Sequence, residues 1–241
     1  MVLTLVVVIL RQRPAEAKPG SLVKTITFRG ARFDVVELPL QRWDVGIGWR
    51  DGGAHLSEVS GAVRTNAGIF EPGFIPTGLL VSGGVELRPL ERRAGEGNFF
   101  LKPNGVFLID EHGAAVVESS EYQPAGVREA TQSGPLLVRR GVLHPKLKED
   151  STHLALRSGV GVRAGKTVVL VISREDVNLW VFAALFRDQL KCPDALYLDG
   201  FISALWAAEA GRDADLDKGP FAGVVTAAPR ADLGAASPGA P

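Results

Sequence analysis

The stretch Asp194-Ala-Leu-Tyr-Leu-Asp199-Gly200-Phe-Ile-Ser203 decides how the rest of the chain is interpreted. Its residues 195–198 form a short apolar run of the kind that makes a buried strand. The run ends at Asp199, where a carboxylate is costly to desolvate unless a partner or a function accounts for it. Gly200 lets the backbone turn sharply or approach a ligand closely. The stretch therefore predicts either an ordinary Asp-Gly turn or the acidic residue of a site.

Four further clusters of the same type interrupt apolar segments elsewhere in the chain. Each places a short polar side chain or an arginine beside a glycine: Asn66-Ala-Gly68, Asn104-Gly105, Gln132-Ser133-Gly134 and Arg157-Ser-Gly159. Loops of this composition at strand ends bring backbone N–H groups and neutral amides together. Any one cluster is explained as a turn. The five together predict a polar pocket with Arg157 as its cation and Asp199 as its anion.

The segments between the clusters predict an α+β fold with a mixed, largely antiparallel sheet core and few helices. The expected strands are the β-branched and apolar runs 22–28, 33–38, 43–49, 79–81, 85–87, 105–109, 114–117, 136–138, 167–172 and 195–198. One strong helix is expected over about 177–190, capped by Ser173 or Asp176. It is apolar almost all round, which predicts that it is buried. A short helix is also expected near 55–59.

Length and composition fit one domain with a sizeable core. The chain has 241 residues, of which 46% are hydrophobic, and a formal net charge of +0, so it lacks the basic surface that indicates nucleic-acid binding. The single cysteine, Cys192, excludes an internal disulfide and a multi-cysteine metal site. Asp213, Asp215 and Asp217 alternate as in a calcium loop, but Val224 occupies the position of the bidentate glutamate. We expect no metal and no cofactor.

The N-terminus carries features of an export signal. Residues 2–10 form an apolar run too short to span a bilayer as a helix, and Ala15-Glu16-Ala17 supplies a cleavage pattern. No positive region precedes the run, and a first β-strand is the alternative. We expect a signal peptide over 1–17, one domain over 18–229 and a disordered tail over 230–241. The mature protein would be periplasmic or extracellular, with no stable membrane span.

Five ordered motifs within residues 28–206 resemble the phosphodiester glycosidase family, and in particular its bacterial branch. They are Asn66-Ala-Gly-Ile-Phe, Gly97-Asn-Phe-Phe-Leu-Lys-Pro-Asn-Gly-Val-Phe107, Ala130-Thr-Gln-Ser-Gly-Pro-Leu136, Arg157-Ser-Gly-Val-Gly161 and Ala195-Leu-Tyr-Leu-Asp-Gly-Phe-Ile-Ser203. The resemblance implies an α+β catalytic domain that hydrolyses a sugar-1-phosphodiester and releases the sugar from a phosphorylated aglycone. A sugar phosphodiester or phosphoglycan would be the partner.

The resemblance also implies which residues form the site. Asp199 would activate water or stabilise the oxocarbenium-like centre, and Arg157 would stabilise charge growing on the phosphate. The substrate-binding residues implied are Asn66, Gly68, Gln132, Ser133, Gly134, Gly200 and Ser203. Phe201 and Ile202 stand where the family commonly has glycines, so we expect a narrowed or reshaped pocket and an altered substrate.

Two other functional classes stay open on the sequence alone. One is a non-enzymatic envelope protein that binds glycan or phosphoglycan through the same pocket, and the other is a structural partner protein with a degenerate site. Release of sugar from an activated sugar-1-phosphodiester, compared with simple binding, separates the enzyme from the binding protein.

Overall fold

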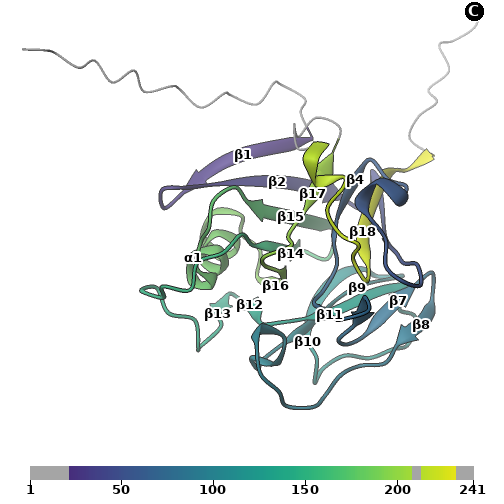
Figure 1. The fold of residues 1–241 in the computed structure, drawn as a ribbon, viewed down its shortest axis with the longest axis horizontal. Helices are drawn as coiled ribbons and strands as arrows, with labels where there is room; N and C mark the ends of the chain where they lie inside the picture. The colour runs from purple at the N-terminus through teal and green to yellow at the C-terminus, as the bar shows by residue number, and fades with distance from the viewer. Residues whose placement is uncertain (1–21, 208–212, 232–241) are drawn as a thin grey trace, which may run out of the picture.

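The structure is a computed structural model that describes residues 22–207 and 213–231. It consists mainly of strands in three large sheets, with little helix (Figure 1). All pairings between described strands are antiparallel. The expected α+β class with a largely antiparallel sheet core and few helices is therefore confirmed. The predicted signal peptide 1–17 and, from residue 232 on, the predicted tail lie outside the described residues.

The largest sheet has seven strands in the order β1-β2-β15-β14-β16-β12-β13. These are β1 (Val23–Phe28), β2 (Ala31–Pro39), β15 (Thr167–Ser173), β14 (Ser158–Arg163), β16 (Asp194–Asp199), β12 (Leu136–Arg139) and β13 (Val142–Leu143). The stretch that opens the sequence argument thus forms an interior strand of this sheet and delivers Asp199 to its end.

Strand β14 shows why the central strands have few polar residues in their sequences: both of their faces are buried. Val160 and Val162 pack into the core that this sheet shares with the other sheets. Gly159 and Gly161 lie on the opposite face, toward the helix, because successive side chains of a strand alternate. A Cβ at Gly159 would lie only 2.9 Å from Cε1 of Phe182, so the glycine allows the helix to pack directly on the sheet.

Two smaller sheets complete the core. One has the order β10-β9-β11-β7-β8 and the other β17-β4-β18-β3. Their bounds are β10 (Gly113–Glu118), β9 (Gly105–Asp110), β11 (Glu129–Ser133), β7 (Leu80–Ser82), β8 (Val85–Arg88), β17 (Leu205–Ala207), β4 (Val63–Asn66), β18 (Val224–Pro229) and β3 (Trp43–Gly48). A two-stranded ribbon pairs β5 (Phe70–Glu71) with β6 (Ile75–Pro76). Short 3-10 turns span Leu56–Glu58, Asn98–Phe100 and Asp213–Asp215.

The expected helix is present but differs in its start and its geometry. It comprises α1 (Leu179–Ala184) and a π turn over Leu185–Gln189. The cap is neither Ser173 nor Asp176 but Asn178, whose Oδ1 accepts a hydrogen bond of 2.8 Å from the Val181 N–H. Ser173 belongs to β15, and its Oγ accepts from the Arg157 backbone N–H. Within the described residues, no helix is long and apolar enough to cross a membrane.

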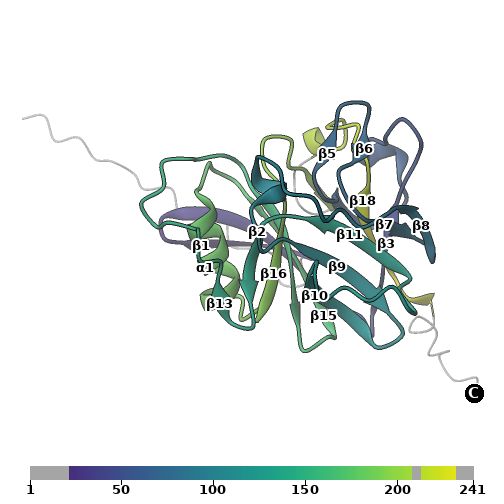
Figure 2. The ribbon, with the colours of Figure 1, turned by 90° about the horizontal axis from the view of Figure 1, so that it is seen from below.

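Figures 1 and 2 place α1 at one side of the molecule and β7 and β8 at the other. The side chains of Phe182, Ala183 and Phe186 from this helical segment pack against the seven-stranded sheet in a second apolar cluster. The first cluster fills the space between the sheets. Because both faces of the large sheet are covered, its interior strands are held rigidly, and the ends of β14 and β16 are fixed relative to each other.

Candidate active site

The ends of β14 and β16 meet at a pocket of about 520 Å³. Asp199 ends β16, and Arg157 immediately precedes β14, so antiparallel pairing brings the two residues to the same end of the sheet. Both line the pocket together with Tyr197 and Gly200, and Asn98 lies in its wall from a neighbouring 3-10 turn. The structure thus brings the predicted cation and anion into one cavity.

Asp199 is partly buried and titrates unusually high for an aspartate. Burial raises its pKa to about 6, and the hydrogen bond from the Gly200 N–H and the charge of Arg157 offset only part of this effect. That hydrogen bond is 2.6 Å long and reaches Oδ1. At pH 7 the carboxylate is therefore mainly ionised, and it lies close enough to its pKa to exchange a proton during a reaction.

Arg157 is 5% exposed and is held by neutral oxygens. Its Nε donates to the carbonyl of Val177 at 3.1 Å, its Nη1 to the Tyr197 hydroxyl at 3.0 Å and its Nη2 to the carbonyl of His153 at 3.0 Å. No ion pair joins it to Asp199 or to another described residue. Because a guanidinium has five N–H groups, two remain for a ligand, together with the undiminished positive charge.

Tyr197 and Asn98 are functional candidates that the sequence argument did not single out. The Tyr197 hydroxyl accepts from Arg157, and burial raises the pKa of this tyrosine to about 12, so it stays protonated. The alternation of side chains along a strand could have indicated it, because Tyr197 is two residues before Asp199. Asn98, which comes from a distant turn, was indicated only by its place in the Gly97–Phe107 motif.

Gly200 has a steric reason to be glycine. A Cβ at this position would lie 2.4 Å from the Tyr197 hydroxyl and 3.3 Å from Nη1 of Arg157. The first distance is well inside van der Waals contact, so a side chain would displace Tyr197 from its hydrogen bond with Arg157. Gly200 therefore shapes the pocket through the space that it leaves.

Asn66 and Ser203 lie beneath Asp199 rather than in the pocket. Asn66 and Ser203 are 1% and 0% exposed. The side chains of both residues form hydrogen bonds with the Ser158 hydroxyl of β14. The Asn66 Nδ2 donates to Ser158 Oγ at 2.9 Å, and the Ser203 Oγ donates to the Asp199 carbonyl at 2.9 Å. This network joins β4, β14 and the turn after β16. A direct contact of either residue with substrate stays a prediction; in this structure they position the backbone of Asp199.

Gln132 and Ser133 occupy a strand, so the expectation that they form a loop was wrong. Both lie in β11, fully buried. Gln132 Oε1 accepts from the N–H groups of Leu79 and Glu91, and its Nε2 donates to the Glu91 carbonyl. Ser133 Oγ donates to the Leu198 carbonyl at 2.9 Å, which ties β11 to β16. Their predicted contact with a sugar or phosphate is untested, and their observed bonds are internal.

The two remaining predicted glycines allow close backbone approach. A Cβ at Gly68 would lie 2.3 Å from the Gln132 carbonyl oxygen, and one at Gly134 would lie 2.5 Å from that of Phe99. Neither lines the pocket. Substrate binding by Gly68 and Gly134 stays a prediction, while the structure explains both residues through packing.

Phe201 and Ile202, which depart from the family pattern, behave differently from each other. Phe201 is 93% exposed and lines the pocket directly after Gly200. Ile202 is partly buried and packs on the cluster that contains Leu56 and Phe221, away from the pocket. Only Phe201 therefore changes the pocket, by placing an unpacked aromatic ring at its rim.

Known proteins are similar to this chain in sequence or in fold. The sequence profile of the phosphodiester glycosidase family matches residues 58–228. An uncharacterised protein of Escherichia coli K12, YigE, is 32% identical over 142 residues, which are 58% of this chain and 56% of that protein. The chain thus spans about half the length of this curated relative.

Two solved structures have a similar fold. The catalytic domain of zebrafish N-acetylglucosamine-1-phosphodiester alpha-N-acetylglucosaminidase, auto-inhibited by its pro-peptide, superposes with a TM-score of 0.61 at 17% identity, covering 90% of this chain and 87% of that one. A hypothetical protein from Synechocystis gives a TM-score of 0.56 at 15% identity, covering 86% and 61%. At these identities the superpositions show the fold alone. The profile match extends over more than half of the sequence and places the motifs around Asn66, Gln132, Arg157 and Asp199 within it, so this chain belongs to the phosphodiester glycosidase family.

Proposed function

We propose that this protein hydrolyses the glycosidic bond of a sugar-1-phosphodiester and releases the sugar from a phosphorylated aglycone. The observation that carries the proposal is the pairing, in one cavity, of the partly buried carboxylate of Asp199 with a buried guanidinium that keeps two N–H groups unused. Glu71 and Glu96 also line this cavity, but both are exposed. Membership of the family supports a hydrolase of this kind. The chemistry that these two groups allow supports this particular reaction.

Arg157 is suited to the phosphate of such a substrate. Its two remaining N–H groups, one on each Nη, can donate hydrogen bonds to phosphate oxygens, and burial strengthens their attraction. As the bond between the anomeric carbon and the phosphate oxygen breaks, negative charge grows on the departing phosphate monoester. A guanidinium already in place stabilises that charge without reorganisation.

Asp199 is suited to the sugar side of the same bond. It removes a proton from the attacking water, or its charge stabilises the oxocarbenium-like centre, while the electron pair of the broken bond leaves with the phosphate. Glycosidases acting on alcohol leaving groups need a second carboxyl to protonate the departing oxygen. A phosphate monoester departs without that proton, so Asp199 is sufficient, and the exposed Glu71 and Glu96 of this pocket need no part in the reaction.

The direct experiment is a panel of sugar-1-phosphodiesters offered to the purified protein, with release of free sugar as the readout. Turnover of at least one substrate that is abolished in Asp199→Asn supports the proposal. Tight binding of the same compounds without turnover would instead support a phosphoglycan-binding protein.

We also propose that the protein is exported, on the strength of the apolar run 2–10 and the pattern Ala15-Glu16-Ala17. The mature chain should then begin at Lys18. N-terminal sequencing of protein from fractionated native cells checks this, and an intact Met1 on cytoplasmic material would contradict it.

A further inference from the structure

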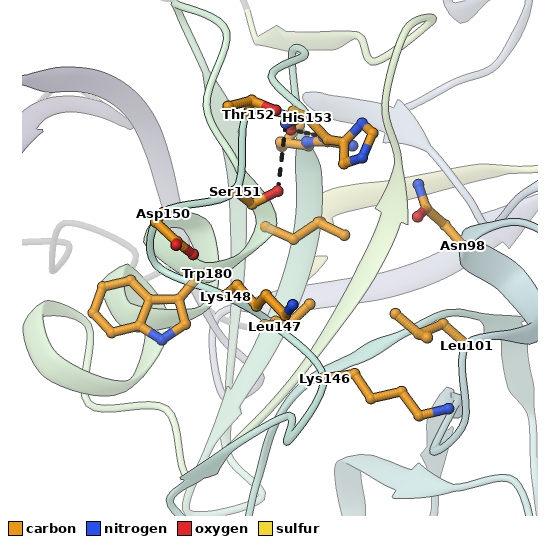
Figure 3. Close-up of a pocket in the computed structure, with 12 residues that line it drawn as sticks. Asn98, Leu101, Lys146, Leu147, Lys148, Asp150, Ser151, Thr152, His153 and Trp180 are labelled. Carbon is orange, nitrogen blue, oxygen red and sulfur yellow. Dashed lines mark hydrogen bonds between the residues drawn. The ribbon is translucent and has the colours of Figure 1, made fainter.

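A second, larger pocket of about 730 Å³ adjoins the candidate active site, and we call it the basic groove (Figure 3). It is lined by residues 146–148 and 150–153, Leu179 and Trp180 of α1, and Asn98, Leu101 and Arg157. Asn98 and Arg157 also line the first pocket, so the two cavities meet at the guanidinium. Figure 3 shows Asn98 and Leu101 on one wall, opposite Asp150, Ser151 and Trp180.

The charges of the basic groove are mainly positive and largely uncompensated. Lys146 and Lys148 are exposed, and neither forms an ion pair with any residue in the described ranges. With Arg157 they contribute three positive charges, against the single acidic side chain of Asp150. Lysines with no internal partner, lining a cavity, form a site suited to an anionic ligand.

The wall that carries these lysines is fixed from outside the basic groove. Glu149 forms an ion pair with Arg29, and the side-chain amide of Asn178 donates to the carbonyls of Glu149 at 2.9 Å and Ser151 at 3.1 Å. At its far end the wall is held by the bond from Arg157 Nη2 to the His153 carbonyl. The groove is therefore preformed, which lowers the entropic cost of binding.

Resting on the proposed function, we propose that the basic groove binds the aglycone, and that the natural aglycone carries a negative charge of its own, such as a second phosphate or a carboxylate. A phosphodiester has two ester arms. With its phosphate on Arg157, the sugar arm extends toward Asp199, and the other arm enters the cavity on the opposite side of the guanidinium. Lys146 and Lys148 then lie along that second arm.

The test compares two forms of each sugar-1-phosphodiester, one with a methyl aglycone and one with glycerol 3-phosphate as the aglycone. The kcat/KM of wild type should be higher for the charged form than for the methyl form. The double variant Lys146→Gln/Lys148→Gln should reduce that preference by about 5- to 20-fold, the scale expected for two exposed charge contacts. The same variant should change kcat/KM for the methyl form by less than about 2-fold. Raising the salt concentration should reduce the preference of the wild type. Lys166→Gln, a lysine exposed elsewhere on the surface, is the matched control and should leave it unchanged.

Binding is measured separately, by calorimetry with Asp199→Asn, so that the two proposals fail independently. If no sugar is released from any compound, the glycosidase proposal is wrong. The groove proposal is still tested by calorimetry, because it predicts tighter binding of the charged form and loss of that difference when the two lysines are replaced. Equal affinity of Asp199→Asn for the methyl and phosphoglycerol forms, or an equal loss of affinity for both when the two lysine substitutions are added, would overturn the groove proposal whatever the turnover shows.

Discussion

At the scale of single residues, the site depends on how Asp199 and Arg157 are placed in their surroundings. Arg157 donates three hydrogen bonds to neutral oxygens and none to a carboxylate of the described residues. Asp199 is therefore not neutralised by contact, and its pKa reflects burial more than attraction. Two opposite charges held apart in one cavity are available to a third group between them, whereas a closed ion pair is not.

Asp199→Asn should separate catalysis from stability. We expect turnover to fall by about 100-fold or more, the scale for a lost acid–base or electrostatic group. Wild-type activity should rise with pH through about 6 as the carboxylate ionises. Near-normal turnover in a folded variant would reduce Asp199 to a turn residue.

The same substitution tests how the ionisation of Asp199 makes the stability of the protein depend on pH. Because burial raises the pKa of Asp199 above 3.8, the folded state holds its proton more tightly than the unfolded state, and stability declines as pH rises from 3.8 through about 6. Asparagine removes the free-energy cost of ionising this buried carboxyl, which is about 1–3 kcal/mol. Thermal melting at pH 5 and pH 8 checks it, since the gain in Tm should be larger at pH 8.

Arg157→Lys should weaken turnover while the fold survives. Lysine keeps the charge but loses the planar fork and cannot make all three internal hydrogen bonds. We expect kcat/KM on a phosphodiester to fall by about 10- to 100-fold, corresponding to about 1–3 kcal/mol for a lost bidentate contact to an ionised group. Unchanged kinetics, with a Tm near that of wild type, would remove Arg157 from the site.

At the scale of elements, one residue connects the helix to the wall of the basic groove. Asn178 caps α1 through Oδ1, and its Nδ2 holds the carbonyls of Glu149 and Ser151. Asn178→Ala should lower stability by about 1–3 kcal/mol, from a lost cap and two unsatisfied carbonyls. Asn178→Ser keeps a capping oxygen but cannot reach the wall, so its Tm should lie between those of wild type and Asn178→Ala. Equal Tm values for wild type and Asn178→Ala would contradict this role.

The elements also show how far the sequence could be interpreted. The first hairpin was predictable, because two β-branched runs flank Arg29-Gly30, and both of these residues adopt positive φ in the turn. The helix cap was not predictable, since serine and asparagine are both good caps. Asn178 is the cap in the structure, because the Ser173 hydroxyl already accepts a hydrogen bond from the Arg157 backbone N–H. Local chemistry offers alternatives, and tertiary contacts choose between them.

The candidate site was predictable in the same uneven way. Asp199 was indicated by a charge at the end of an apolar run, a signal that needs no partner to be seen. Gln132 gave a similar polar signal, yet it is enclosed in β11 with its amide satisfied internally. A buried amide that serves the scaffold and one that binds a ligand look alike in sequence, because the difference lies in the direction of the side chain.

At the scale of the whole molecule, Cys192 offers a probe of global unfolding. It is 1% exposed between the helix and the large sheet, and burial raises the pKa of its thiol to about 12. Because the thiolate is the reactive form, we expect almost no labelling by a disulfide reagent at pH 8 in the native state, and complete labelling in denaturant. Cys192→Ala is the blank, since the chain has no other cysteine. Rapid labelling of the native protein would show that this layer opens locally.

The pairing of early strands with late ones constrains how the protein is made. Strand β2 pairs with β15, and Trp43 of β3 pairs with Pro229 of β18. A ribosome delivers the N-terminal strands first, so the nascent chain carries β2 and β3 without these partners until the last strand has emerged. Contacts this far apart in sequence form slowly and leave apolar edges open meanwhile. Chaperone cover during synthesis should therefore matter more for the yield of this protein than for its final stability.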